Sequence, residues 1–394
     1  MNLATIDKCT GCSACANACS HDAITMEPDS EGFLRPMIDE KKCIECHLCE
    51  KSCPIVSPNT NINTDNPRAY AMWSLLDRTI SSSGGAFSAF ARMILNNGGI
   101  VFGAAFDEQF VCHHIRVEHL DGLKSLRGSK YVQSSIGTIF REVKKDLNKG
   151  KYVLFCGTPC QIAGLKSFLR KDNEKLLLLD LACHGVPSNG IFQAYLQKIS
   201  TRFAGTLEGF EFTSKRDGWG FAPSISLGGK FSPIYGTDAL YMSAFDRNAI
   251  FRKSCYSCPF ACLPRLGDCS LADFWGIGRH GKKFEHSVTK GVSLVLSNNE
   301  KGQSFIDKLT DVFIEERNLN EALVENHNIS HSSILYPMRN EVVKAFLNKN
   351  LSLDDIEKQY HLIDKSLKSK VKEYASKYHV FDMVKYIYNI WKAK

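Results

Sequence analysis

Two cysteine runs near the N-terminus constrain this chain more than any other feature. In each run, gaps of two, two and three residues separate the cysteines, which are Cys9, Cys12, Cys15, Cys19 and then Cys43, Cys46, Cys49, Cys53. Three thiolates at this spacing can hold three corners of an iron–sulfur cube, while the fourth cysteine reaches the neighbouring cube. We therefore predict two interleaved ligand sets, Cys9, Cys12, Cys15 and Cys53 for one 4Fe-4S cluster and Cys19, Cys43, Cys46 and Cys49 for the other.

Pairs of cysteines two residues apart also suit structural zinc sites and disulfide frameworks. Two tandem matches to the full bacterial ferredoxin spacing favour clusters over both alternatives. Between the runs, residues 22–26 and 32–38 have the pattern of a short hairpin with its turn at Pro28–Gly32. Residues 1–57 are thus predicted to form a small ferredoxin-like α+β domain, followed by a polar linker, Ser57–Pro67.

The composition of the chain indicates its cellular compartment and argues against two classes of protein, those that span membranes and those that bind nucleic acids. Its 394 residues include 16 cysteines in cluster-type spacings, and the start lacks a charged-then-apolar signal segment, which favours a reducing cytoplasm. The longest apolar runs fall far short of the ~20 residues that span a bilayer. A net charge of +7 without a basic stripe between aromatics speaks against nucleic-acid binding.

The middle of the chain alternates apolar strands with helical patterns. Strands are predicted at residues 68–73, 100–106, 151–156 and 176–181, each followed by a loop and a helical or polar segment. This order predicts an α/β sheet with functional loops at the strand ends. Cys160 and Cys183 both lie on such loops, whereas Cys112 and Cys156 lie in extended stretches and are predicted core residues.

The segment Ser81–Leu95 begins with serines and two glycines before an apolar helical pattern. A helix start of this kind presents free backbone amides, which suits either a phosphate or an ordinary capped helix. A later Gly276-x-Gly278-x-x-Gly281 sequence resembles a dinucleotide fingerprint, but no helical pattern follows it. We therefore predict that residues 276–281 are a loop.

The end of the chain is basic. From Lys365 to Lys394, eight lysines stand against Glu373 and Asp382, a net charge of +6, with aromatic residues between them. Residues 340–394 are predicted to form a helical C-terminal tail. Such a tail suits docking on a partner subunit or an anionic membrane surface, and equally suits packing on its own domain.

Together these motifs resemble the beta subunits of coenzyme F420-dependent hydrogenases and dehydrogenases. The resemblance rests on the ferredoxin head and on five later motifs, which are Ser83–Ser88, Gly128–Tyr131, Gly157–Gln161, Cys183–Gly185 and Cys255-x2-Cys258. It extends to the plant hydroxymethyl chlorophyll reductases. Members are iron–sulfur flavoproteins that hold FAD without a Rossmann fingerprint. The resemblance thus implies an α/β flavin- and 4Fe-4S-binding domain over residues 68–335.

The resemblance also implies the site residues. The FAD contacts would be Ser83, Gly84, Gly85, Ala86, Phe87, Ser88, Gly128, Ser129, Lys130, Tyr131, Gln133, Gly157 and Thr158. Lys130 and His184 are candidate catalytic groups, since a titratable loop residue beside a cofactor can tune it.

A third 4Fe-4S cluster has two incompatible candidate ligand sets. Local spacing favours Cys255, Cys258, Cys262 and Cys269, and the resemblance favours Cys160, Cys183, Cys255 and Cys258. Cys160 and Cys183 follow buried strands, and neighbouring parallel strands would bring their loops to one sheet edge. We therefore predict the second set.

These features predict an oxidoreductase that passes electrons between a hydride carrier, F420-like or another organic molecule, and ferredoxin-type clusters through FAD. A ferredoxin or another redox protein is the expected partner. Two alternatives remain open. One is a ferredoxin-dependent reductase of an organic substrate, and the other is a non-catalytic electron-relay subunit of a larger complex.

Overall fold

The N-terminal segment forms a small unit around the two cysteine runs. The structure, a computed structural model, describes residues 3–58, 63–215, 219 and 223–366. Two short helices, α1 (Ala14–Ala18) and α2 (Leu48–Lys51), flank the antiparallel hairpin of β1 (Ile24–Pro28) and β2 (Leu34–Ile38). The side chain of Asp29 accepts hydrogen bonds from the backbone of Glu31 and Phe33 and so fixes the turn. The predicted hairpin is confirmed.

An eight-stranded mixed sheet forms the centre of the body. Its order is β13-β3-β12-β11-β7-β6-β4-β5. The strands are β3 (Arg68–Ser74), β4 (Ile100–Phe106), β5 (Cys112–Val117), β6 (Val153–Gly157), β7 (Leu176–Leu181), β11 (Cys269–Asp273), β12 (Ser293–Ser297) and β13 (Val312–Arg317). Strands β4, β6, β7 and β11 run parallel, whereas β5, β12 and β13 pair antiparallel with their neighbours. The predicted α/β sheet is therefore present as a mixed sheet.

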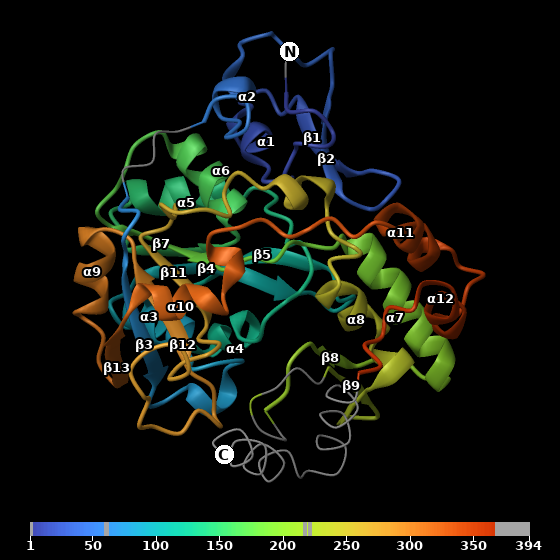
Figure 1. The fold of residues 1–394 in the computed structure, drawn as a ribbon. Coiled ribbons are helices and arrows are strands. Elements are labelled where there is room, and N and C mark those ends of the chain that lie inside the picture. The colour runs from blue at the N-terminus through green and yellow to red at the C-terminus, as the bar shows by residue number, and fades with distance from the viewer. Residues whose placement is uncertain (1–2, 59–62, 216–218, 220–222, 367–394) are drawn as a thin grey trace.

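Helices cover both faces of this sheet (Figure 1). On one face, α3 (Ala86–Asn96) and α9 (Glu300–Ile306) bury Phe90, Ile94 and Phe305 against the strands. On the other face lie α5 (Ile139–Asn148) and α6 (Pro159–Leu169). Strand β7 reads Leu-Leu-Leu-Leu-Asp-Leu, as expected of a strand covered on both sides. The N-terminal unit packs on α5 and α6 through α1.

A second apolar core lies beside the sheet. It joins the small sheet of β8 (Gly209–Glu211), β9 (Ser224–Leu227) and β10 (Lys230–Pro233) to the helices α7 (Asn189–Phe203), α8 (Leu240–Asp246), α11 (Arg339–Leu347) and α12 (Leu353–Tyr360). Phe33, from the turn of the N-terminal hairpin, is buried in the same core. The remaining short helices of the body are α4 (Leu123–Leu126) and α10 (Leu319–Val324).

This core changes the interpretation of the predicted C-terminal tail. Val342, Phe346 and Ile356 are fully buried, so α11 and α12 belong to the body. The reason is their amphipathic pattern, through which α11 packs on α7 and α12 packs on α11. Residues 367–394, which carry most of the predicted basic tail, lie outside the described residues.

Two negative expectations can be compared with the structure. Residues 276–281 form turns, with no helix following before β12 among these described residues, so the predicted loop is confirmed. Over the part of the chain that the structure describes, the helices are too short or too polar to cross a bilayer.

Candidate iron–sulfur and cofactor site

The carboxyl edge of the parallel strands collects the predicted functional loops. Strands β6 and β7 pair in parallel, so the loops after Gly157 and Leu181 leave the sheet side by side. The loop after β6 leads into α6, which places Cys160 in its first turn, and Gln161 accepts a hydrogen bond from the backbone of Thr158 at 3.0 Å. Cys183 follows β7 by two residues. The predicted juxtaposition of the Cys160 and Cys183 loops is confirmed.

Cys255 and Cys258 approach these two cysteines. Burial raises the pKa of the Cys183 thiol well above its usual value, and the nearby sulfurs of Cys255, Cys160 and Cys258 raise it further. The pKa of Cys255 is raised to about 12 by burial and then, among other contributions, by Cys160 and Cys258. Each sulfur thus lies within electrostatic reach of the others. We call Cys160, Cys183, Cys255 and Cys258 the inner group.

The competing ligand set does not come together. Cys269 lies in the middle of the sheet on β11, is fully buried, and packs in the core beneath α3 and α9. Its thiol pKa is raised by burial and then by Asp268 and Asp180, with no cysteine among the causes. Cys262 is exposed and donates to the carbonyl of Pro259 at 3.3 Å. Spacing alone suggested this set, and the strand geometry separates its members.

The first ferredoxin ligand set surrounds a cavity in the N-terminal unit. Cys9, Cys12, Cys15 and Cys53 all line it, together with apolar residues that include Leu3 and Ile55. Burial raises the pKa of Cys15 to about 12, and Cys9 and Cys53 raise it further. This set, which we call the middle group, therefore has the shared apolar enclosure that a cluster needs.

The second ferredoxin set lies at the surface. Cys46 is exposed and the neighbouring Ile44 is 62% exposed. Backbone amides point at two of its sulfurs, from Ala23 to Cys19 at 3.3 Å and from Glu45 to Cys43 at 3.4 Å. Amide donors of this kind stabilise negative charge on cluster sulfurs and tune potential. We call Cys19, Cys43, Cys46 and Cys49 the outer group.

The cysteine groups do not have the geometry of a zinc site. Among the residues that the structure describes, no three His, Cys, Asp or Glu side chains converge closely enough to bind one metal ion. A tetrahedral zinc ion needs four ligands at about 2.0–2.3 Å. A 4Fe-4S cube binds each cysteine at a different corner, so its ligands stay further apart than those of a single ion.

The middle and inner groups meet across α6. Cys12 is buried, and its thiol pKa is raised by burial and, among other contributions, by Cys15, Cys160 and Cys9. A Cβ atom placed on Gly164 of α6 would lie 3.0 Å from both the Cβ and the Sγ of Cys12. The absence of a side chain at Gly164 therefore allows the two cysteine groups to approach.

This contact gives a first prediction. Gly164→Val should push α1 away from α6 and cause partial loss of iron from the middle group, with the outer group retained, because the added atoms would overlap Cys12. Iron analysis and electron paramagnetic resonance (EPR) would measure both effects. Gly103→Ala is the control, since its new Cβ would meet no atom closer than 3.5 Å. Full iron content in Gly164→Val would contradict the assigned contact.

A buried salt bridge fastens the loop that carries Cys255, Cys258 and Cys262. Arg265 and Asp180 are joined at 2.7 Å, and both side chains are completely buried. Arg265 also donates to the carbonyls of Phe260 and Leu181, at 3.3 and 2.9 Å. Because Leu181 precedes Cys183 by two residues, this pair connects the two halves of the inner group.

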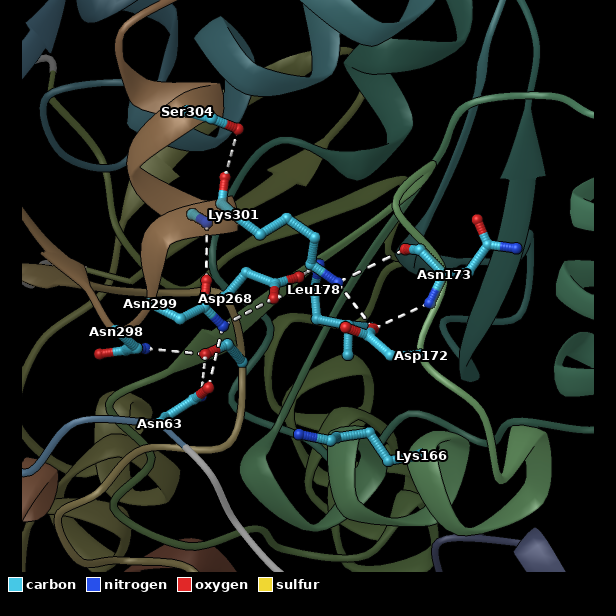
Figure 2. A network of polar contacts seen from close by, with 12 residues as sticks. Asn63, Lys166, Asp172, Asn173, Leu178, Asp268, Asn298, Asn299, Lys301 and Ser304 are labelled. Carbon is cyan, nitrogen blue, oxygen red and sulfur yellow. Dashed lines mark hydrogen bonds and ion pairs between the residues drawn. The ribbon is translucent and has the colours of Figure 1, made fainter.

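A second polar network continues this attachment (Figure 2). Asp268 accepts a hydrogen bond from the backbone of Leu178 at 2.8 Å and lies 3.3 Å from the Lys301 ammonium. Asn63, from the linker, donates to the carbonyls of Arg265 and Gly267 at 2.8 and 2.9 Å. The linker, β7 and the cysteine loop are thereby held in one arrangement.

The predicted FAD-contact loops also meet at this edge. The backbone of Ser129 donates to Ser82 Oγ at 2.9 Å, and Arg127 donates to Ser88 Oγ at 3.1 Å. These contacts bring residues 83–88, which begin α3, beside the loop Gly128–Tyr131. Lys130 lies in this loop, and burial lowers its pKa to about 8. Gly157 ends β6 at the same edge, and Thr158 follows it as the N-cap of α6.

Two glycines at the start of α3 differ in their physical role. Gly85 has φ of +87°, so a side chain there would be strained. A Cβ on Gly84 would lie 2.3 Å from the Met72 carbonyl oxygen and 2.6 Å from the Ser293 amide nitrogen. The sheet itself therefore requires glycine at position 84.

Three other predicted residues are placed as follows. Gln133 does not face this edge, because it is buried between the N-terminal unit and the body and donates to the carbonyl of Thr10 at 2.8 Å. His184 follows Cys183 directly, and burial lowers its pKa. Its ring lies 6.2 Å from that of Phe245. The ring of Tyr131 packs edge-on against Phe245, at 4.7 Å.

Two half-buried charged side chains that the sequence did not predict, Lys215 and Asp273, also lie here. Lys215 donates to the carbonyls of Arg78 at 2.6 Å and of Ser83, and burial lowers its pKa to about 8. Burial raises the pKa of Asp273, at the end of β11, to about 6. Its Oδ1 atom is buried without a hydrogen-bond partner among the described residues. A strand-end acid before an aromatic pair, Asp273-Phe-Trp, was the available signal.

Two regions of the chain match models of known protein families. Residues 8–56 match the model of the 4Fe-4S dicluster domain, and residues 150–322 match the model of the C terminus of the coenzyme F420 hydrogenase/dehydrogenase beta subunit. An uncharacterized polyferredoxin-like protein of Methanocaldococcus jannaschii is 34% identical over 68 residues, which cover 15% of this chain and 40% of that protein. The chain thus spans well under half of that relative's length.

A solved structure shows a weaker likeness. One chain of the F420-reducing NiFe hydrogenase complex from Methanosarcina barkeri aligns with a TM-score of 0.44 and 15% identity, covering 75% of this chain and 91% of that chain. The family models identify the two regions directly. The chain is an iron–sulfur, oxidoreductase-like protein that contains a 4Fe-4S dicluster domain and is related, through residues 150–322, to the beta subunits of coenzyme F420 hydrogenases and dehydrogenases.

Proposed function

We propose that this protein transfers electrons between a hydride-carrying small molecule and ferredoxin-type clusters by way of bound FAD. One observation carries the proposal, namely that Cys12 lies against the helix whose first turn holds Cys160. A dicluster domain joined to the body only through the linker would not require contact between a cluster ligand and α6. Its presence supports electron passage between the N-terminal unit and the carboxyl edge of the sheet.

The three cysteine groups would hold three 4Fe-4S clusters. The order that follows from their neighbours is inner, middle and outer, since Cys12 of the middle group lies within electrostatic reach of Cys160 of the inner group, while Cys46 of the outer group is exposed. An external redox protein would then exchange single electrons with the outer cluster. The proposed domain division places the first domain at residues 1–57 and starts the body at residue 68, and the body extends past the predicted end at residue 335 to include α11 and α12.

FAD would lie at the carboxyl edge, between the start of α3 and the loop Gly128–Tyr131. Bound there, it would accept a hydride as an electron pair and release the electrons one at a time. The protein offers backbone amides at a helix start, the Lys130 ammonium and the Oδ1 atom of Asp273, which accepts no hydrogen bond from the residues that the structure describes. Amides and a cation suit the diphosphate, while the carboxyl group suits a hydroxyl or ring N–H donor.

An anaerobic flavin and reduction experiment tests this function. Protein purified gently should contain FAD, and its visible spectrum should bleach with reduced F420, NADH or another hydride donor. Bleaching only with reduced ferredoxin would favour the reductase alternative, and bleaching with none would favour a relay subunit. Absence of flavin, with none bound in titration, would refute the FAD assignment.

A matched pair of glycine variants locates the flavin. Gly85 and Gly98 flank α3, and both have positive φ, of +87° and +67°. Valine should strain the backbone at either position, but only Gly85→Val should release FAD, because only that end faces the proposed phosphates. The FAD-to-protein ratio, with iron content as a folding control, measures the difference. Equal loss in both variants would contradict the placement.

A further inference from the structure

Arg252 differs from the other fully buried arginines of the described chain. Arg252, Arg265 and Arg339 are the largest side chains with almost no exposed surface. Arg265 pairs with Asp180, and Arg339 pairs with Glu31 at 2.5 Å. Among the residues that the structure describes, no carboxylate lies within ion-pair distance of Arg252, whose hydrogen bonds go to neutral oxygens. A buried charge without a counter-charge is costly, so it calls for an anionic neighbour.

The contacts of Arg252 place it between two cysteine groups. Its Nη1 atom donates to the carbonyl of Cys9 at 3.1 Å, and Nη2 donates to that of Leu34 at 2.9 Å. Its own carbonyl accepts from the amide of Cys255, and its amide donates to Val186, both at 2.9 Å. The guanidinium of Arg252 thus faces the middle group. The backbone of Arg252 belongs to the segment that leads into Cys255 of the inner group.

The guanidinium is held firmly in this position. Gln133 Oε1 accepts from Nε at 3.0 Å and from Nη2 at 2.8 Å, and Gln133 itself donates to Thr10. The ring of Phe33 lies 4.8 Å from the guanidinium carbon. Gly11 has no side chain to obstruct it, since a Cβ there would lie 2.6 Å from Nη2. Such constraints keep a charge at one place between two sites.

We propose that Arg252 is a positioning residue whose fixed positive charge raises the reduction potentials of the middle and inner clusters together, so that electrons pass between them. This inference rests on the proposed function, because it requires clusters in both groups. Reduction of a cluster adds one electron, breaks no bond and makes its net charge more negative by one. The electron comes from the neighbouring cluster, or from dithionite in a titration. A nearby cation stabilises the reduced form most.

Arg252 also links its positive charge to the docking of the N-terminal unit on the body. The carbonyl of Cys9 accepts from Arg35, Arg252 and Ser254, at 3.0, 3.1 and 3.2 Å. Two of these donors belong to the body, so the charge reaches the middle cluster only when the N-terminal unit is docked. Within the described part of the chain, the side-chain hydrogen bonds of Arg252 do not reach the outer group, which therefore serves as an internal reference.

The test is an anaerobic redox titration of the full-length protein followed by EPR. Arg252→Gln should shift the midpoint potentials of the middle and inner clusters to more negative values, with the outer cluster unchanged. Arg252→Lys, which keeps the charge, should restore most of the shift. Arg339→Gln is the matched control, because it removes another buried arginine that joins the N-terminal unit to the body and also lies near Phe33.

A second variant tests the inference if the Arg252→Gln protein loses its iron–sulfur clusters. Gln133→Glu places a carboxylate on the guanidinium without changing side-chain size, so it should lower the same two potentials. Unchanged potentials in Arg252→Gln or in Gln133→Glu overturn the inference, as does an equal shift in Arg252→Lys and Arg252→Gln. Wild-type protein with fewer than three cluster signals refutes the proposed function instead, and is distinguished by its iron content.

Discussion

Cys160→Ser is expected to lower the iron content from about twelve to about eight atoms per chain. The reason is that Cys160 lies with Cys183, Cys255 and Cys258 at the carboxyl edge of the sheet, so its loss removes one corner of the inner cluster. Anaerobic iron and sulfide analysis measures the change. EPR should show the loss of one signal, with the middle and outer signals present.

Cys262→Ser is the matched control for that experiment. Cys262 belongs to the same loop, yet its thiol is exposed and donates to a neighbouring carbonyl. Its replacement should leave about twelve irons. Loss of about four irons from the Cys262 variant, with the Cys160 variant unaffected, would refute the inner group. Zinc in place of iron in the wild-type protein would refute all three assignments.

Asp180→Asn is expected to lower the free energy of unfolding by about 3–5 kcal/mol. The substitution leaves the Arg265 charge in a completely buried position without its partner. It also weakens the contact through which Asp180 Oδ2 accepts from the amide of Gly267 at 2.8 Å. Urea unfolding under anaerobic conditions, followed by circular dichroism, measures the loss.

The surface pair Arg68–Glu316 supplies the comparison. Its side chains are 54% and 53% exposed, so Glu316→Gln should cost about 0–1 kcal/mol. A double variant, Asp180→Leu with Arg265→Met, should regain part of the lost stability because it leaves no buried charge. If Asp180→Asn costs no more than Glu316→Gln, the salt bridge does not fasten the inner-group loop as described.

Local patterns predicted the elements whose partners are near in sequence. The hairpin β1–β2 and the parallel pair β6–β7 follow from alternation and from short apolar runs, and both are present. Strands β12 and β13 were not predicted. Both pair with β3, more than 200 residues earlier, and their short runs carry no local signal for that pairing. Together with β5, these antiparallel strands make the sheet mixed.

The sequence predicts the cysteine ligands better than it predicts the residues around them. Spacing identifies the ferredoxin cysteines because a cube demands fixed intervals. Burial of Arg252 and Arg265 was not predicted, because a single arginine is most often exposed. The signal that could have identified Arg252 is the apolar run Ala249-Ile-Phe251 directly before it, together with Cys255 three residues after it. The prediction of Gly84 as an FAD contact did not foresee how closely Ser293, which is distant in sequence, approaches it.

The contact between Arg252 and Cys9 also affects the order of events during synthesis. These residues are 243 positions apart, so the N-terminal unit leaves the ribosome long before the segment that covers it. Nascent chains should therefore present the middle-group cysteines to the cell's iron-delivery machinery throughout that interval. Thiol labelling of ribosome-bound chains of increasing length would detect this, with Cys9 becoming protected only after Arg252 and Ser254 have emerged. Iron loading would then precede closure of the interface.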